Sequence, residues 1–192
     1  MNKKLAAALS GGAVLVAALT GCSSGGSENN DKLDAWAKQV CDAVQPQAKK
    51  IAAANAAIQK ETSDNSAPAD VQKTDAKAFQ DMSDAYKAIG AAVNSAGAPD
   101  VDNGKKKQQD AVKELNQIGA SYASLKKQVD ELDTKDQSKF ADGLKDIATQ
   151  LDKLSTTGND ALKNLEEGDV GKAMAKQESC KSASSPASAS AG

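Results

Sequence analysis

The side chains of this chain that could do covalent chemistry are three cysteines, Cys22, Cys41 and Cys180. The chain contains no histidine, and all 24 of its basic residues are lysines. Histidine is the usual general base at neutral pH and the commonest metal ligand, so acid–base catalysis and metal binding lose their most frequent side chain. The chemistry left to the cysteines is acylation of a thiol or formation of a disulfide.

No catalytic constellation accompanies the cysteines. Without histidine, a serine nucleophile lacks its usual activating base. Residues 100–104 are similar to the start of a calcium loop, but Gly104 comes one position too early and Ala111 stands where a glutamate is required. Acidic residues gather near the expected helix ends and are interpreted as solvated: Asp130, Glu131, Asp133, Glu166 and Glu167. We therefore expect no enzyme, no metal site and no cofactor.

The first residues of the chain are typical of an export signal. Lys3 and Lys4 precede an uncharged stretch, residues 5–20, that is rich in Ala, Leu and Val. This stretch is shorter than the roughly 20 residues of a membrane-spanning helix and has the size of a signal-peptide core. It ends in Leu19-Thr20-Gly21-Cys22, an aliphatic residue and two small ones before a cysteine. An ordinary secretory leader, in which this cysteine is a coincidence, is the alternative.

Leu19-Thr20-Gly21-Cys22 resembles the bacterial lipobox in residue order and in position. The resemblance implies that the Cys22 thiol receives a diacylglycerol and that a dedicated peptidase, which recognises Leu19, Thr20 and Gly21, cuts just before Cys22. Two acyl chains anchor far more firmly than one, at about 0.8 kcal/mol per buried CH₂. We therefore expect a signal peptide at residues 1–21. The mature chain would be lipid-anchored on the outer face of the cytoplasmic membrane, with its folded part extracytoplasmic.

Composition divides the mature chain into three parts. Residues 22–31 are polar and rich in Gly and Ser, which predicts a lipidated, flexible tether. Residues 182–192 are mostly Ser and Ala, which predicts a disordered tail. Residues 32–181 show helical periodicity and no alternation with period two, so they are expected to form one all-α domain.

The helical periodicity resolves into four long segments and a short one. Apolar residues recur at steps near 3.6 over residues 33–58, 71–93, 112–132 and 140–165. A short segment from Val170 to Cys180 follows a break at Gly168-Asp169. Pro68 marks the start of the second segment, and Thr134 with Gln137 forms a capping-box pair before the fourth. Short connections favour an antiparallel up-down helical bundle of four long helices plus a short C-terminal helix, with long coiled coils as the alternative.

Cys41 and Cys180 remain as an even pair once Cys22 carries lipid, and the expected compartment is oxidising. Each lies on the apolar side of its expected helix, so both thiols are placed to face the core. A bridge between them would close a loop of 139 residues. The chain-entropy model gives about 5 kcal/mol for such a loop, as an upper value. We expect the disulfide Cys41–Cys180; two buried free thiols are the alternative.

Three further features concern the surface and the core. Trp36 falls on the apolar stripe of the first segment and is interpreted as a core aromatic rather than a ligand-stacking residue. Gly90 and Gly119 lie beside core positions and are expected to mark close approach of helices. Residues 105–107 are three lysines, interpreted as solvated charges, with contact to anionic headgroups as the alternative.

The leader, the polar tether, the Ala/Lys/Asp-rich helices and the outlying cysteines together resemble the small secreted lipoproteins of actinobacteria. The residues that carry this resemblance are Leu19 to Cys22, Cys41, Gly168-Asp169 and Cys180. It implies a location and brings no mechanism. Nucleic acid is a poor partner, because acidic residues outnumber basic ones.

The expected function is therefore a membrane-anchored, non-catalytic module of the cell envelope. It would act in interaction or structure, with the membrane as partner through the Cys22 lipid and an envelope protein as a second partner. The alternative is a carrier that binds an apolar small molecule or lipid between its helices. The sequence leaves the oligomeric state open.

Overall fold

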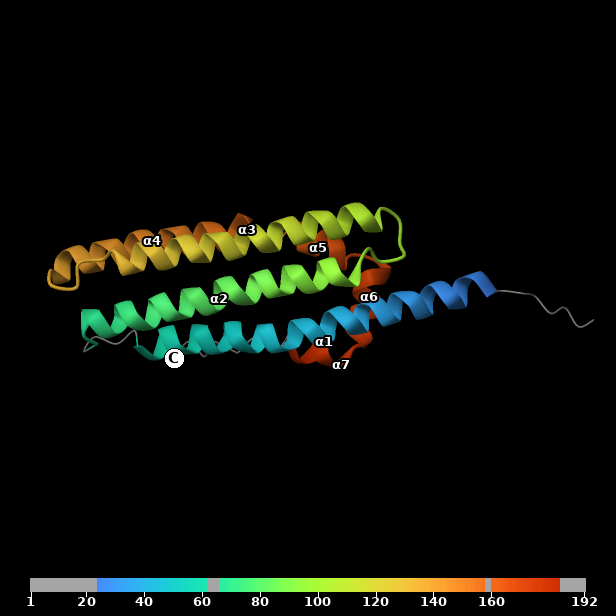
Figure 1. Cartoon of the computed structure of the whole chain (residues 1–192), viewed down its shortest axis with the longest axis horizontal. Coiled ribbons are helices and arrows are strands. Elements are labelled where there is room, and N and C mark those ends of the chain that lie inside the picture. Colours follow the sequence, from blue (N-terminus) through green and yellow to red (C-terminus); the bar gives the residue numbers. More distant parts are fainter. Residues whose placement is uncertain (1–23, 62–65, 158–159, 184–192) are drawn as a thin grey trace, which may run out of the picture.

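The computed structural model describes residues 24–61, 66–157 and 160–183. Within these ranges it contains seven helices, α1 Ser24–Glu61, α2 Pro68–Ala96, α3 Gly104–Asp130, α4 Gln137–Thr157, α5 Asp160–Glu166, α6 Asp169–Lys176 and α7 Glu178–Ala183. No strand occurs in the described ranges, so the prediction of an all-α chain is confirmed. Figure 1 shows α1 to α4 lying lengthwise beside one another, with α5, α6 and α7 gathered toward the end of this array where α1 begins.

The C-terminal part has more helices than the sequence predicts. The fourth expected helix, to Leu165, corresponds to two helices, α4 and α5. The short last helix is also divided, because Gln177 has an extended backbone with φ −82° and ψ 125°. Gly168, with φ +72°, separates α5 from α6 in a conformation that strongly favours glycine. Periodicity shows which side chains face the core, but it does not register a one-residue change of backbone direction.

The first helix begins earlier than expected. α1 starts at Ser24, so residues 24–31, predicted as part of a flexible tether, are helical. Adding a residue to an existing helix gains one hydrogen bond per residue fixed, and no proline precedes Pro46 in α1. A polar, Gly-containing composition therefore does not prevent helical extension from the packed part of α1.

The starts of α2 and α4 test two capping predictions. α2 begins at Pro68, as predicted, since proline is well suited to the first helical position. The prediction that Thr134 and Gln137 form a capping pair is wrong. Gln137 is already the first residue of α4, and the side chain that accepts a backbone hydrogen bond is that of Asp136, from the Lys139 amide at 3.2 Å. Hydrogen bonding to the backbone and side chain of Lys139 lowers the pKa of Asp136.

α2 and α3 approach each other closely at Gly119, as its position beside the core predicts. The buried Ser83 hydroxyl on α2 donates a hydrogen bond to the Gly119 carbonyl on α3 at 2.7 Å. A Cβ at position 119 would lie 3.0 Å from the Ser83 carbonyl oxygen and 2.9 Å from Lys87 Cγ. Gly90 is less crowded, because a Cβ there would lie 3.4 Å from its nearest neighbours. The contact at Gly119 therefore requires a residue without a side chain.

Two apolar clusters fill the interior, one toward each end of the array. The first core combines α1, α2, α3, α5 and α6, through Leu33, Trp36, Ala37, Val40, Ile89, Val93, Ala111, Leu115, Leu165, Val170 and Ala173. The second core combines α1, α2, α3 and α4, through Ala54, Ala78, Phe79, Met82, Leu125, Val129 and Ile147. Alanines contribute to both, which allows the helices to approach closely.

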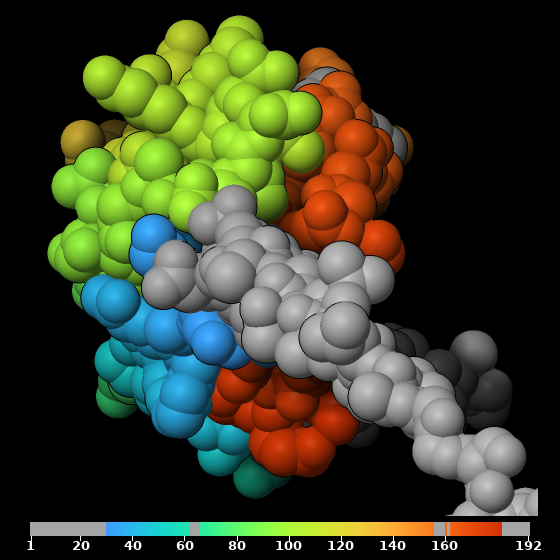
Figure 2. Space-filling view, turned by 90° about the vertical axis from the view of Figure 1, so that its right-hand side faces the viewer, coloured from blue at the N-terminus to red at the C-terminus, as the bar shows by residue number. Residues whose placement is uncertain are grey.

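The C-terminal helices complete the first core. Val170 and Ala173 of α6 and Leu165 of α5 are buried in it. The end-on view of Figure 2 shows these segments, in orange and red, against α1 in blue and beside the green and yellow-green helices. Lys176 on α6 forms an ion pair with Asp34 on α1 at 3.0 Å. The first core is therefore closed by helices that lie far away in the sequence.

Candidate functional site

The residues with the clearest sequence signal lie outside the described ranges. Leu19, Thr20, Gly21 and Cys22 all precede Ser24, so the lipid attachment and the peptidase recognition stay predictions. Among the helices of the described ranges, none is both long and apolar enough to cross a bilayer.

The predicted disulfide is present. Cys41 on α1 is bonded to Cys180 on α7, with their Cα atoms 5.0 Å apart. Cys41 is fully buried, and α7 lies against α1. The Ser179 hydroxyl beside Cys180 donates to an Asp42 carboxylate oxygen at 2.6 Å. Hydrogen bonds from Lys38 and Ser179 lower the pKa of Asp42. The disulfide therefore holds the last described helix on the first long one.

Trp36 is a core residue, as interpreted from its position on the apolar stripe. Its side chain is 6% exposed and belongs to the first core. Its indole nitrogen donates a hydrogen bond to the Gly97 carbonyl at 2.8 Å. Gly97 ends α2 with φ +77°, a conformation that strongly favours glycine. The indole thus fixes the end of α2 against α1, and its polar edge is already occupied.

The charged residues singled out from the sequence lie mostly in solvent. Asp130 pairs with Lys126 one helical turn earlier, and Lys106, the middle of the three lysines, pairs with Asp110. Exposed pairs of this kind contribute less than about 1 kcal/mol. The described residues include no group of three or more Cys, Asp or Glu side chains placed to hold a metal ion.

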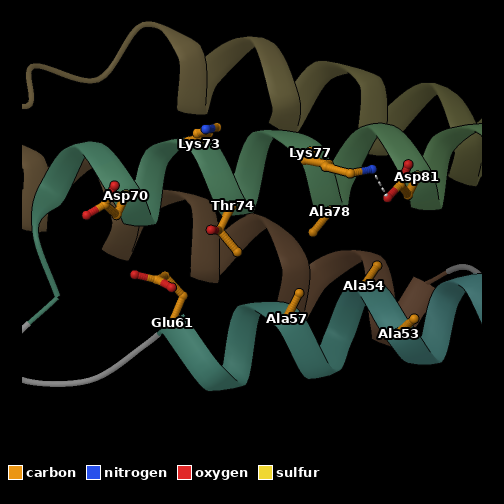
Figure 3. A pocket seen from close by; sticks show the side chains of 10 residues that line it. All are labelled: Ala53, Ala54, Ala57, Glu61, Asp70, Lys73, Thr74, Lys77, Ala78 and Asp81. Carbon is orange, nitrogen blue, oxygen red and sulfur yellow. Dashed lines mark hydrogen bonds and ion pairs between the residues drawn. The ribbon is translucent and has the colours of Figure 1, made fainter.

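A surface groove runs between α1 and α2. Figure 3 shows alanines of α1 on one wall and longer polar side chains of α2 on the other. The groove has a volume of about 630 Å³. Lys77 and Asp81 on its α2 wall form an ion pair at 2.7 Å, which Figure 3 marks. Its floor includes Ala54 and Ala78 of the second core. The groove is a mixed-charge surface with a narrow apolar floor.

A second hollow differs in character. It has a volume of about 390 Å³ and lies where α1, α2 and α4 meet beside the second core. Its lining is almost entirely apolar, with Ser66, Asp75 and Gln137 as the polar exceptions. The other lining residues are Ile58, Pro68, Val71, Phe79, Phe140, Ala141, Leu144, Ile147, Ala148 and Leu151. We call this hollow the α1–α2–α4 pocket.

Among the described residues that line the α1–α2–α4 pocket, Asp75 is the only acidic or basic one. It is 7% exposed, and no described residue provides a hydrogen-bond partner for its Oδ1 atom. Burial, with a smaller contribution from the negative charge of Glu61, raises the pKa of Asp75 to about 6. At neutral pH this carboxylate is therefore largely ionised, and one of its oxygens lacks a donor.

Asp75 is not among the site residues predicted from the sequence. The signal was nevertheless present, because Val71, Asp75 and Phe79 follow one another at intervals of four, so that an acid occupies a position on the apolar stripe of α2. Asp75 is also far in sequence from the acidic pairs near helix ends, which drew attention by their number. A single polar residue within an apolar stripe is a stronger indication of a site than several on a solvated face.

In comparisons with known proteins, no family model, no curated protein and no solved structure matches the chain. The case for a function therefore rests on the chain's own residues, and first on the α1–α2–α4 pocket and Asp75.

Proposed function

We propose that this chain is a lipid-anchored extracytoplasmic carrier, a non-catalytic helical domain that binds a small apolar molecule in the α1–α2–α4 pocket. The lipobox-like residues before Cys22 support the anchor. Lipidation there would hold the domain on the outer face of the cytoplasmic membrane. The long, mainly polar exteriors of α1 to α4 fit a domain that stands in water on such an anchor.

The proposed architecture is an antiparallel up-down bundle of α1 to α4, completed by the short C-terminal helices. The short connections between consecutive helices support this arrangement. So does the second core, to which α1, α2, α3 and α4 all contribute side chains. In a bundle of this kind, ligand sites form between side chains of facing helices, and the pocket has such a position.

The observation that carries the carrier function is the α1–α2–α4 pocket itself. Its volume of about 390 Å³ lies within the roughly 300–1,000 Å³ of small-molecule sites. Such sites combine a mainly apolar lining with a few polar groups that orient the ligand, and here those groups are Asp75, Ser66 and Gln137. Ala-rich helices can approach closely and leave little space between them, so a pocket of this size favours binding.

The carrier can be tested on protein extracted from its own membrane in mild detergent, by native mass spectrometry. The expected result is a diacylglyceryl mass on Cys22 together with a retained small molecule. Ala148→Trp should displace that molecule, because the larger side chain would occupy part of the pocket. Ala148 is an exposed lining residue, so this substitution should not disturb the second core. Lys145→Trp is the matched control, since Lys145 is exposed on the same helix and lines no part of this pocket.

Each part of the proposal has its own contrary result. A chain without the lipid mass would contradict the anchor and leave the carrier intact. A lipidated chain that holds no small molecule, or that holds one equally well with Trp at position 148, would contradict the carrier.

The second candidate is an interaction module whose partner is an envelope protein. The groove between α1 and α2 favours it, because Lys and Asp side chains beside an apolar floor can meet a partner helix of complementary charge. Co-extraction of a second polypeptide that is lost in the charge reversal Lys73→Glu, and kept in Lys145→Glu, would favour this candidate. Extraction of the chain alone would count against it.

A further inference from the structure

Among its described lining residues, the α1–α2–α4 pocket has one charged group in a mainly apolar lining. Asp75 projects from α2 between Val71 and Phe79, which are both buried. Phe140 and Ile147 of α4 line the same pocket and are also buried. A ligand in this pocket therefore meets hydrocarbon over most of its surface and a carboxylate at one point.

One oxygen of this buried carboxylate lacks a partner. The Oδ1 atom accepts no hydrogen bond from any described residue, and no lysine is among the described residues that line the pocket. A buried carboxylate oxygen without a donor is costly, and a charged donor is the most effective remedy. The charge of Glu61, at the end of α1, also acts on Asp75, and because it is negative it adds to the need for a cation.

A metal ion does not fit this requirement. Calcium takes six to eight oxygen ligands and magnesium six, and the described lining of the pocket offers one carboxylate beside hydrocarbon. An anionic ligand such as a fatty acid would add a further negative charge to those of Asp75 and Glu61. The remaining class is an organic cation with an apolar body.

We infer that the ligand of the α1–α2–α4 pocket is a small amphiphilic amine, whose apolar body packs against Phe79, Phe140 and Ile147 and whose ammonium group donates hydrogen bonds to Asp75. This inference rests on the proposed carrier function and adds the chemical class of the ligand. Asp75 is the residue that selects the head group, and the lining of α4 accommodates the hydrocarbon. The raised pKa of Asp75 agrees with the need for a counter-ion, since binding a cation favours the ionised form.

The test uses three probes with one hydrocarbon body and different heads: 4-phenylbutylammonium, 4-phenylbutanol and 4-phenylbutyrate. Binding to the full-length lipidated protein in phosphatidylcholine nanodiscs is measured by titration calorimetry at pH 7.5, with empty nanodiscs as the blank for partitioning. The ammonium is expected to bind at least about ten-fold more tightly than the alcohol, a difference of about 1.4 kcal/mol. The carboxylate is expected to bind more weakly than the alcohol.

Asp75→Asn is the decisive variant, because it keeps the shape of the side chain and removes its charge. It should abolish the preference for the ammonium, so that the variant binds the ammonium no more tightly than the alcohol. Asp70→Asn is the matched control, since Asp70 is an exposed acid on the same helix that does not line this pocket. Circular dichroism of both variants verifies that their helices are intact.

The inference fails if the ammonium does not bind, if the three heads bind alike, or if Asp75→Asn keeps the preference for the ammonium. These results are separable from failure of the carrier. Head-independent binding that Ala148→Trp abolishes would leave the carrier standing and remove only the amine. Absence of binding by all three probes overturns the amine, and the carrier is then decided by the small molecule retained in native mass spectrometry.

Discussion

The two cores of this protein are completed in different ways. At the first core, the indole of Trp36 donates to the Gly97 carbonyl and the Cys41–Cys180 disulfide holds α7 on α1. At the second core, the cluster borders the α1–α2–α4 pocket, and Asp75 is buried with one carboxylate oxygen unpartnered. One end of the array is thus cross-linked by a disulfide, whereas the other end has a mainly apolar pocket with a buried acid.

This difference indicates that the first core contributes mainly to stability and that the second core adjoins the proposed binding site. A hollow and an unpaired carboxylate both lower the free energy of unfolding, and a domain of modest stability tolerates them only when other interactions compensate. The disulfide is suited to this compensation, because it restricts the unfolded chain whichever part of the fold is strained. We therefore expect perturbations of the first core to reduce stability and removal of the Asp75 charge to increase it.

The largest expected effect is that of breaking the disulfide. Cys41→Ser should lower the free energy of unfolding by about 2–4 kcal/mol, because the bridge closes 139 residues of chain. Adding Cys180→Ser should cost little more, since the bond is already lost. Urea unfolding measures both. Hydrogen exchange should show its largest loss of protection in α6 and α7, which the bridge holds near α1. Losses that add across the two substitutions would contradict the role of the bridge.

Trp36→Phe is expected to cost about 2 kcal/mol. The substitution keeps an aromatic ring in the first core but removes the hydrogen bond to the Gly97 carbonyl and part of the buried apolar surface. Thermal unfolding followed by circular dichroism provides the measurement, since Trp36 is the one tryptophan of the chain. A loss below about 0.5 kcal/mol would mean that the indole does not secure the end of α2.

Beside the second core, the Gln72 side chain on α2 forms hydrogen bonds with the end of α3. Its amide nitrogen donates to the carbonyls of Val129 and Leu132, each at 2.9 Å, where α3 ends. Gln72→Met keeps the length of the side chain and should cost about 1–1.5 kcal/mol, because the carbonyls lose these donors. Gln80→Met on the same helix is the control, since the Gln80 amide bonds to the exposed Asp84. Equal losses in the two variants would show that Gln72 does not hold α2 and α3 together.

The sequence contained enough information to predict the all-α chain, the start of α2 and the partner of Cys41, because these depend on periodicity, on proline chemistry and on the count of cysteines. It did not predict the division of the C-terminal segments, since a helix break at Gln177 depends on the tertiary position of α7 on α1. The sequence also led to the prediction that Thr134 caps α4. In the structure, Asp136 lies next to the first helical residue and accepts a hydrogen bond from the Lys139 amide.

The candidate site was harder to predict than the fold. Apolar spacing shows that Val71 and Phe79 face inward, but it does not show how completely three helices fill the space between them. A cavity is the difference between the volume the backbone encloses and the volume the side chains occupy. Helix α4 contributes small residues, Ala141 and Ala148, to the lining of the pocket. The placement of an acid within the apolar stripe of α2 was the one sequence signal that pointed there.

The smallest predicted effect has the opposite sign and depends on pH. The pKa of Asp75 is raised from 3.8 to about 6 in the folded chain, so its ionised form destabilises the fold. This penalty is absent below about pH 3, develops between about pH 4 and pH 6, where the unfolded chain ionises before the folded chain does, and is complete above about pH 6. Asp75→Asn should therefore raise the free energy of unfolding by about 1 kcal/mol at pH 7.5, after allowance for solvent that reaches the pocket, and leave it unchanged at about pH 3.

Urea unfolding at the two pH values measures this difference, with Asp70→Asn as the control for loss of an exposed negative charge on the same helix. A gain that is equal at both pH values would arise from packing or helix propensity and not from the charge. A loss at pH 7.5 would mean that the ionised carboxylate has a stabilising partner within the folded chain. The buried acid would then stabilise the second core, and the contrast between a cross-linked end and a binding end would no longer hold.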